Sequence, residues 1–323
     1  METVRWGILG TGFIANKFAN AVKNAEGARL VAVASRNAAS VDKFADTYQI
    51  EHRFDSYEAM ADFDGVDAVY IALPHTYHPV YAKFFMEAGK HVLSEKPICA
   101  NLRQLKELMA VRKEKNVYLM EAMWTRFLPA IQKIKQMVED GVIGEVREIS
   151  ADFCYNQDDR THHVFKRECA GGSLLDVGIY GLNFASIFLG DKVVDFQTAA
   201  YQKDGVEERI NILLRYPNGA IARVSSAISL LKPEDGYIYG DKGYIRIPHF
   251  YSASEFEVVT ETASQTYNFP YKGNGFEEEI EECNRCILAG KTQSDIMPLE
   301  QSAAILRLMD AIRKQAGITF DVD

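Results

Sequence analysis

The segment Val4–Ala15 constrains the fold of this chain more than any other part of the sequence. A short apolar run ends in the pattern Gly10-x-Gly12-x-x-Ala15, and a helical pattern follows at once. Gly10 allows a tight turn, Gly12 allows a phosphate group to approach the backbone, and Ala15 lets the helix pack closely on the strand. The pattern predicts a strand, a glycine turn and a helix whose N-terminus attracts phosphates.

Apolar segments and helical patterns alternate from Val4 to about Leu119. Strands are predicted near residues 4–9, 28–34, 67–73, 91–94 and 117–119, and the helices between them include 76–88 and 101–115. Such alternation is typical of a parallel sheet with helices on its faces. The nearly continuous apolar run 67–73 fits a strand that is buried on both sides. We therefore predict that residues 1–121 form a Rossmann dinucleotide-binding domain of the α/β class.

The pattern changes after Glu121. A helix near 127–139 precedes β-patterned stretches at 145–156, 192–201, 207–216, 220–230, 236–247 and 254–269, which a helical piece at about 174–188 interrupts. Two helices, at about 276–289 and 298–316, close the chain, and turn sequences such as Pro217-Asn218-Gly219 separate the strands. We predict that residues 122–323 form a second, α+β domain with a large, mostly antiparallel sheet.

Composition excludes several other classes of protein. The 323 residues are 47% hydrophobic and 25% charged, and the net charge is −9, so we expect no nucleic-acid partner. No apolar run approaches the roughly 18 residues of a membrane span, so no membrane contact is expected either. The glycines of the first strand argue against a signal peptide, and a cytoplasmic location with reduced thiols is the expectation.

Two further patterns have simple structural interpretations. Cys283-x-x-Cys286 has no second pair at zinc spacing, and both cysteines fall on the apolar stripe of a predicted helix, which favours buried structural thiols. The acidic run 277–282 is most simply a solvated helix face broken by Ile280. The stretch Asp158–His163 carries adjacent acids and histidines, and we interpret it as a substrate-side loop rather than a metal site.

The residues after the second predicted strand indicate the cofactor. NAD-binding units usually carry a carboxylate there, which binds the adenosine ribose. This chain has Ser35-Arg36-Asn37 instead, and the guanidinium of Arg36 suits a 2′-phosphate. The alternative is an exposed arginine at the end of a strand. We predict NADP as the cofactor, with NAD as the less favoured choice.

A lysine follows the predicted strand 91–94. In an open parallel sheet, ligands bind beyond the carboxyl ends of the strands, which places Lys96 of Ser94-Glu95-Lys96-Pro97 where a substrate meets the nicotinamide. A partly desolvated lysine exchanges protons near neutral pH. Taken alone, the segment is more simply explained by a surface lysine paired with Glu95.

Four motifs in this order and spacing resemble those of the Gfo/Idh/MocA oxidoreductase family over nearly the full length. They are Gly10-x-Gly12-x-x-Ala15, Pro74-His75-x-x-His78, Glu95-Lys96-Pro97 and Gly171-Gly172-Ser173-x-x-Asp176-x-Gly178-x-Tyr180-x-x-Asn183. The segment Glu121–Pro129 is similar to a branch of that family that includes dimeric dihydrodiol dehydrogenases and NADP-dependent D-xylose 1-dehydrogenases. The resemblance supports the predicted Rossmann domain and assigns substrate binding and oligomerisation to residues 122–323.

The resemblance implies roles for particular residues. Lys96, Asp176 and Tyr180 are expected to be catalytic, with Tyr180 as the acid/base where many members carry histidine. The cofactor is expected to contact Gly10, Gly12, Phe13, Ile14, Ser35, Arg36, Asn37, Leu73, Pro74, His75, His78, Glu95 and Lys96. The substrate is expected to contact Trp124, Arg126, Phe153, Asp176, Tyr180 and Phe276. No metal is expected, and His75 departs from the family pattern, in which asparagine more often follows the proline.

These expectations lead to a functional hypothesis. Asp176, Tyr180 and Asn183 are spaced i, i+4, i+7, so they are expected to share one helix face. We expect hydride transfer between NADP and a hydroxyl carbon of a sugar or trans-dihydrodiol, with Tyr180 as acid/base assisted by Lys96. The alternatives are a dehydrogenase of another polyol, inositol or amino sugar, and a non-catalytic dinucleotide sensor. A homodimer through the second domain's sheet is also expected.

Overall fold

The computed structural model describes residues 3–323. The chain divides into two compact units. Unit 1 comprises Met1–Trp124 and Tyr271–Ala303, and unit 2 comprises Thr125–Pro270 and Ala304–Asp323. The sequence analysis placed all of 122–323 in the second domain, whereas the structure adds Tyr271–Ala303 to the first unit.

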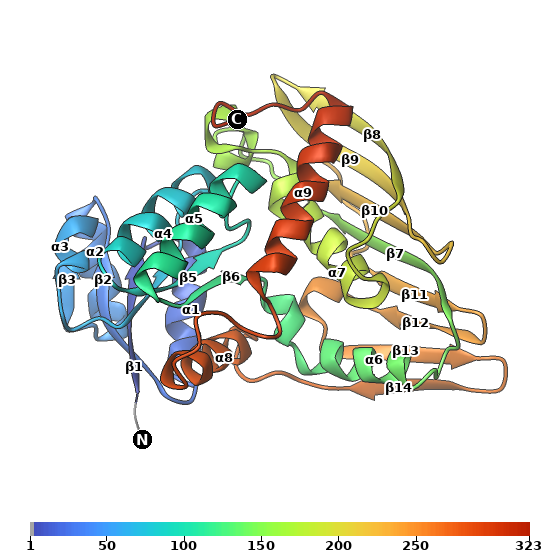
Figure 1. Ribbon diagram of the computed structural model, residues 1–323, viewed down its shortest axis with the longest axis horizontal. Helices are drawn as coiled ribbons and strands as arrows, with labels where there is room; N and C mark the ends of the chain where they lie inside the picture. Colours follow the sequence, from blue (N-terminus) through green and yellow to red (C-terminus); the bar gives the residue numbers. More distant parts are fainter. Residues whose placement is uncertain (1–2) are drawn as a thin grey trace. The chain divides into compact units, whose positions relative to one another are not determined.

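Unit 1 is built on a six-stranded parallel sheet with the strand order β3-β2-β1-β4-β5-β6 (Figure 1). The strands are β1 (Val4–Leu9), β2 (Ala28–Ala34), β3 (His52–Phe54), β4 (Ala68–Ile71), β5 (His91–Glu95) and β6 (Leu119–Ala122). The connecting helices are α1 (Phe13–Val22), α2 (Ala38–Tyr48), α3 (Tyr57–Ala61), α4 (His78–Glu87) and α5 (Leu102–Lys115). The order reverses between β1 and β4, and doubly wound sheets bind ligands at that point. The predicted Rossmann domain is confirmed.

Three buried aromatic rings join the first βα unit to the middle of this sheet. Trp6 of β1 meets Phe18 of α1 edge-on, with ring centres 5.4 Å apart, and Phe18 stacks on Tyr70 of β4 at 3.8 Å. The edge-on contact of Trp6 and Phe18 is a favoured aromatic geometry, which adds to the stabilisation from burial alone. The glycine turn after β1 therefore stands on a rigid core.

Helix α8 (Glu277–Leu288) explains why the late segment belongs to unit 1. Its Asn284 accepts a hydrogen bond from the indole N–H of Trp6 (2.9 Å) and donates one to the carbonyl of Glu26 (2.8 Å). The helix also packs against α1, β1 and β2. The apolar stripe in the sequence predicts this helix correctly, but a stripe does not state which surface will cover it.

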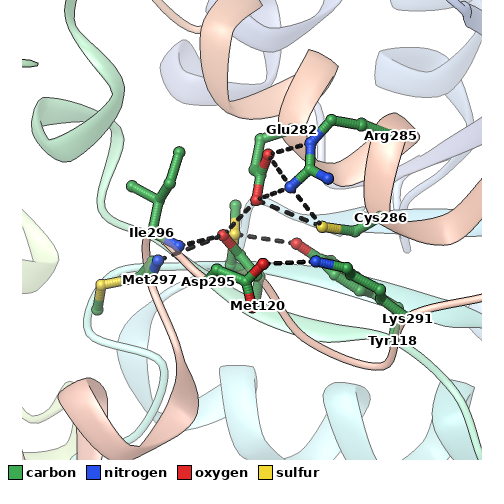
Figure 2. A network of polar contacts seen from close by, with 10 residues as sticks. Tyr118, Met120, Glu282, Arg285, Cys286, Lys291, Asp295, Ile296 and Met297 are labelled. Atoms are coloured by element: carbon green, nitrogen blue, oxygen red, sulfur yellow. Dashed lines mark hydrogen bonds and ion pairs between the residues drawn. The ribbon is translucent and has the colours of Figure 1, made fainter. Parts of the chain in front are cut away.

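The segment that follows α8 is held by a polar network around Glu282 (Figure 2). The carboxylate of Glu282 accepts hydrogen bonds from Arg285 (2.8 and 2.9 Å) and from the hydroxyl of Ser294 (2.6 Å), and the Sγ of Cys286 lies 3.3 Å away. Cys283 and Cys286 are buried, and burial raises the pKa of both thiols. Protonated thiols are poor nucleophiles and ligands, so both cysteines are structural, as predicted.

Unit 2 is built on an eight-stranded sheet with the order β14-β13-β12-β11-β7-β10-β9-β8 (Figure 1). Its strands are β7 (Val146–Cys154), β8 (Asp195–Lys203), β9 (Val206–Arg215), β10 (Ile221–Ala227), β11 (Gly236–Gly240), β12 (Gly243–Ile247), β13 (Glu255–Thr260) and β14 (Ser264–Asn268). Neighbouring strands run antiparallel except β7 and β10, which are parallel. The predicted, mostly antiparallel sheet is confirmed.

One face of this sheet is covered by helix α7 (Ile179–Leu189), which packs on β7 and β10. Ala222 and Val224 of β10 are buried, whereas Ile221 and Arg223 are exposed, as their alternation predicts. The other helices that contribute to unit 2 are α6 (Pro129–Glu139) and the later part of α9 (Leu299–Ala316).

The helical stretch Arg167–Leu189, which ends with α7, is long and apolar enough by composition to cross a membrane. However, 78% of its most apolar window is buried inside the structure. A buried core helix passes the same compositional test as a membrane span. The packing of α7 on the sheet therefore accounts for this composition.

Candidate functional site

The glycine turn of unit 1 leaves room for a ligand at its backbone. Gly10 has a φ of +97°, and a Cβ there would lie 2.5 Å from the carbonyl oxygen of Ala72, so only glycine fits. At Gly12, φ is −78° and a Cβ would meet no atom within 4 Å. Nothing in the described protein requires glycine at position 12, which fits a phosphate approaching from outside. Within residues 3–323, no side chain caps the start of α1, and uncapped helix N-termini attract anions.

Arg36 lies among aromatic rings beyond the end of β2. Its guanidinium carbon is 5.5 Å from the centre of the Tyr77 ring. The Ser35 N–H donates to the last residue of β3 (3.2 Å), and the side chain of Asn37 caps α2 by accepting a backbone N–H (3.1 Å). Of Ser35, Arg36 and Asn37, only Arg36 carries a positive charge. It is the second residue after β2, where NAD-specific units carry an acidic residue.

His78 links the loops that follow β4 and β5. Its Nε2 lies 2.6 Å from the carbonyl oxygen of Leu73, and its Nδ1 lies 2.7 Å from that of Pro97. A protonated imidazole carries the two N–H donors that satisfy both carbonyls. The buried ring of His75 is 5.9 Å away, edge-on to His78. His78 thus shapes the predicted cofactor site through the backbone of the two loops.

Glu95 anchors the backbone of Lys96. The buried carboxylate accepts the N–H of Lys96 at Oε2 (3.1 Å) and the hydroxyl of Tyr70 at Oε1. Burial raises the pKa of Glu95, while the ammonium of Lys96 and the Tyr70 hydrogen bond oppose that rise. Since Tyr70 belongs to the aromatic core, Lys96 begins at a well-fixed point directly beyond β5.

Two of the predicted substrate residues gather in unit 1. The indole of Trp124 meets the ring of Phe276 edge-on at 5.1 Å and lies 6.4 Å from Tyr271. The Nζ of Lys17 is 6.0 Å from the centre of the Phe276 ring. Phe153, the third aromatic residue that the sequence analysis proposed, belongs to unit 2.

The acidic run at the start of α8 is not a solvated face, contrary to the interpretation of the sequence. Glu277, Glu279 and Glu282 are buried. Among residues 3–323, neither carboxylate oxygen of Glu279 has a hydrogen-bond partner. Burial, followed by the nearby Glu95 and Glu278, raises the pKa of Glu279 well above its usual range. The folded unit therefore favours the protonated acid.

Replacing Glu279 with methionine should stabilise the protein by about 1–4 kcal/mol at pH 8, as found when buried charged groups give way to apolar ones of similar volume. The pKa of Glu279 is higher in the folded state, so wild-type stability falls as pH rises above the ordinary value of 4.5. The variant's advantage should therefore grow between pH 5 and pH 8. Thermal unfolding at both pH values measures this difference, with Glu281→Met as control, because Glu281 lies on the same helix, is only half-buried and pairs with Lys272. A Glu279→Met melting temperature at or below wild type at pH 8 would contradict the prediction.

In unit 2, Asp176 is held by a residue that the sequence analysis missed. The hydroxyl of Tyr155 donates to Oδ2 of Asp176 at 2.6 Å. Burial, reinforced by Asp176, raises the pKa of Tyr155, so the phenol keeps its proton and the carboxylate stays an acceptor. Tyr155 stands two residues after Phe153 at the end of β7, so their side chains are expected to share a face of the sheet. That alternation was the available signal.

Tyr180 lies in an aromatic cluster with Phe153 and Tyr251. Phe153 stacks on Tyr251 with ring centres 4.0 Å apart, and Tyr180 lies 5.4 Å from Phe153 and 5.9 Å from Tyr251. Tyr180 itself is 7% exposed. Tyr251 follows a short irregular stretch with no periodic pattern, so the sequence held no signal for it.

Asn183 and Arg126 pair within unit 2. The Nε of Arg126 donates to Oδ1 of Asn183 (3.1 Å), and its Nη2 donates to the hydroxyl of Ser186 (2.7 Å). Asn183 also donates to the carbonyl of Ile179 (3.1 Å). These hydrogen bonds show that both side chains help to fix α7. The substrate contact that the sequence analysis predicted for Arg126 would be a second role and stays a prediction.

The loop 158–163 is tied to β9. Arg160 forms an ion pair with Glu208 (2.6 Å), and its guanidinium lies 3.8 Å from the centre of the Phe165 ring. Asp159 accepts hydrogen bonds from the backbone and hydroxyl of Thr161 (2.8 and 2.7 Å). Within residues 3–323, no three His, Cys, Asp or Glu side chains are grouped so as to hold a metal ion.

The fold and the glycine turn together define a dinucleotide-binding protein of the Rossmann type. A family model described as an oxidoreductase family with an NAD-binding Rossmann fold matches residues 4–123, and the model of that family's C-terminal domain matches residues 131–246. The chain belongs to the Gfo/Idh/MocA oxidoreductase family, as its motifs indicated.

Similar proteins span the whole chain. It is 33% identical to a trans-1,2-dihydrobenzene-1,2-diol dehydrogenase of Xenopus laevis and 32% identical to one of Danio rerio, over 98% and 99% of this chain and 99% of each relative. An aldose-aldose oxidoreductase from Caulobacter crescentus, complexed with glycerol, has a TM-score of 0.91 at 27% identity, over 98% of both chains. A 3-ketoreductase from Actinomadura kijaniata, in complex with NADP and TDP-benzene, has a TM-score of 0.90 at 25% identity, over 97% of this chain and 98% of that one.

Proposed function

We propose that this oxidoreductase is an NADP-dependent dehydrogenase that acts on a CH–OH group of a sugar or a trans-dihydrodiol. The observation that carries the proposal is the group in unit 2, where the Tyr155–Asp176 hydrogen bond and the aromatic cluster around Tyr180 occur together. Aromatic faces suit both the apolar side of a sugar ring and an aromatic diol. The names of the similar dehydrogenases and of the aldose oxidoreductase support these two substrate classes.

The proposed roles follow from the chemistry of each side chain. The nicotinamide, when bound, supplies the hydride acceptor. Tyr180 accepts the proton of the substrate hydroxyl at its phenolic oxygen, and Asp176, aligned by Tyr155, holds a second hydroxyl. The ammonium of Lys96 lowers the pKa of Tyr180 and stabilises the developing alkoxide.

Arg36 carries the proposed preference for NADP. Arg36→Ala should weaken NADP binding by about 1.5–3 kcal/mol, the usual size of a charged hydrogen bond, so KM for NADP should rise about tenfold to hundredfold. KM for NAD should change little, because NAD has no 2′-phosphate. Steady-state kinetics with both cofactors measures this, with Arg29→Ala, at the other end of β2, as control. An unchanged ratio of the two KM values would rule out the assignment.

A substrate panel tests the proposed function as a whole. The purified protein is incubated with NADP or NAD and a series of aldoses, polyols and trans-dihydrodiols, and the absorbance of the reduced nicotinamide is followed. Turnover confined to aldoses or dihydrodiols supports the proposal. Turnover confined to the polyols shifts the function to a polyol or inositol dehydrogenase, and cofactor binding without any turnover shifts it to a dinucleotide sensor.

Two further expectations stay predictions. A homodimer is expected through the sheet of unit 2, whose outer face exposes Leu213 and Ile221. A cytoplasmic location is expected from the sequence.

A further inference from the structure

A buried acid stands directly behind the helix that carries the proposed catalytic tyrosine. Glu207, on β9, is 1% exposed and was not singled out in the sequence. Its Oε2 accepts the backbone N–H of Leu174 (2.9 Å), and its Oε1 accepts the hydroxyl of Ser173, which lies 2.9 Å from the hydroxyl of Ser226. A single carboxylate on β9 thus binds two successive residues at the start of the helical segment.

Leu174, whose backbone N–H binds Glu207, also accepts the hydrogen bond that closes an unusual helical turn. Leu174–Gly178 is π-helical rather than the regular α-helix that the sequence predicts, and the N–H of Ile179 bonds to the carbonyl of Leu174, five residues back. Asp176 lies within this turn, and Tyr180 is the second residue after it. Wide turns of this kind are frequent at functional sites. The spacing between Asp176 and Tyr180 therefore depends on where Leu174 is held.

The backbone is built to admit this carboxylate. Gly172 has a φ of +124°, and a Cβ there would lie 3.1 Å from both the carbonyl oxygen and Oε2 of Glu207. Burial raises the pKa of Glu207 to about 8, even though the bonds from Ser173 and Leu174 favour its ionised form. Since burying an acid costs stability relative to an apolar residue of similar size, stability alone does not account for Glu207.

We propose that Glu207 is a positioning residue that fixes the π-helical turn and so sets the placement of Asp176 relative to Tyr180. This inference rests on the proposed function for its effect on catalysis. The position of the turn itself is independent of the substrate, so it can be measured separately.

Two variants separate hydrogen bonding from charge. Glu207→Met keeps the length of the side chain but accepts no hydrogen bond from Leu174. Glu207→Gln removes the charge but keeps an oxygen for Leu174 and an amide that can donate to Ser173. We expect Glu207→Met to lower kcat about 10- to 100-fold, the usual effect of a small misplacement of catalytic groups, with KM for NADP unchanged. Glu207→Gln should stay near wild type.

Amide hydrogen exchange measures the turn directly. Glu207→Met should speed exchange at Leu174–Tyr180, while β9 and β10 exchange as in wild type. The matched control is Glu208→Met, which removes the adjacent acid that pairs with Arg160 and should leave the turn unchanged. If Glu207→Met does not fold, Glu207→Asp, which is too short to reach Leu174, should show the same change to a smaller degree.

The outcomes distinguish the two proposals. Wild-type exchange at Leu174–Tyr180 in Glu207→Met, or an equal loss of protection throughout unit 2 in Glu207→Met and Glu208→Met, would overturn the positioning role. A second result would also overturn the positioning role: an equal loss of kcat in Glu207→Gln and Glu207→Met, with wild-type hydrogen exchange in both variants. That result would mean that Glu207 acts through its charge alone. Faster exchange in Glu207→Met, in a protein that turns over nothing on the panel, would refute the proposed function and leave the positioning role standing.

Discussion

Tyr180→Phe should lower kcat by about 10²- to 10⁴-fold, the range for loss of a general acid/base. The ring stays in place because its contacts with Phe153 and Tyr251 do not need the hydroxyl, so the fold and the aromatic surface should be retained. The affinity for NADP should also be retained, since the cofactor motifs lie in unit 1. The lost group is then the proton acceptor alone.

The measurement is steady-state kinetics on the best substrate from the panel, combined with a titration of NADPH binding. Tyr244→Phe, which removes the hydroxyl of a tyrosine on β12, serves as the control for a general loss of one phenolic oxygen. If Tyr180→Phe keeps full kcat, the acid/base is another group, and the carboxylate of Asp176, which Tyr155 aligns, becomes the next candidate.

Much of the fold could be predicted because it is written in local patterns. The glycine turn, the apolar strand 67–73 and the alternation in β10 each report which face of an element is buried, and the structure agrees with them. A hydrophobic pattern does not show which other helix or sheet covers the buried face. This is why α8 was correctly predicted as a helix but was placed in the second domain, whereas the structure groups it with unit 1, and why its glutamates were interpreted as solvated.

The candidate site was less predictable because its residues depend on contacts distant in sequence. In our proposals, Tyr155 matters because it donates a hydrogen bond to Asp176, and Glu207 matters because it accepts one from Leu174. The two residues of each pair are more than twenty positions apart in the sequence. In our proposal the π-helical turn replaces a predicted α-helix because Glu207 binds the backbone of Leu174, and no helix propensity encodes that contact. The cofactor contact predicted for His78 stays a prediction, but the sequence did not indicate that its ring nitrogens would lie within hydrogen-bond distance of two backbone carbonyls.

Lys96→Met should lower kcat by about 10²- to 10³-fold, the usual cost of removing one electrostatic stabiliser of developing charge. Methionine replaces the apolar stem of lysine and lacks only the ammonium end, and the backbone N–H of residue 96 keeps its bond to Glu95, so the loop after β5 should hold its shape. A positive charge near a phenol lowers the pKa of that phenol, so its removal should shift the Tyr180-dependent limb of the kcat profile to higher pH.

The pH profile separates this role from simple loss of binding. Lys96→Arg should restore part of the rate and part of the shift because it returns the charge, whereas Lys83→Met, at an exposed lysine of α4, should change neither. A lower rate with an unshifted profile would mean that Lys96 holds substrate without tuning Tyr180. Full activity in Lys96→Met would remove the lysine from the mechanism, and proton transfer would then have to be explained by the groups of unit 2 alone.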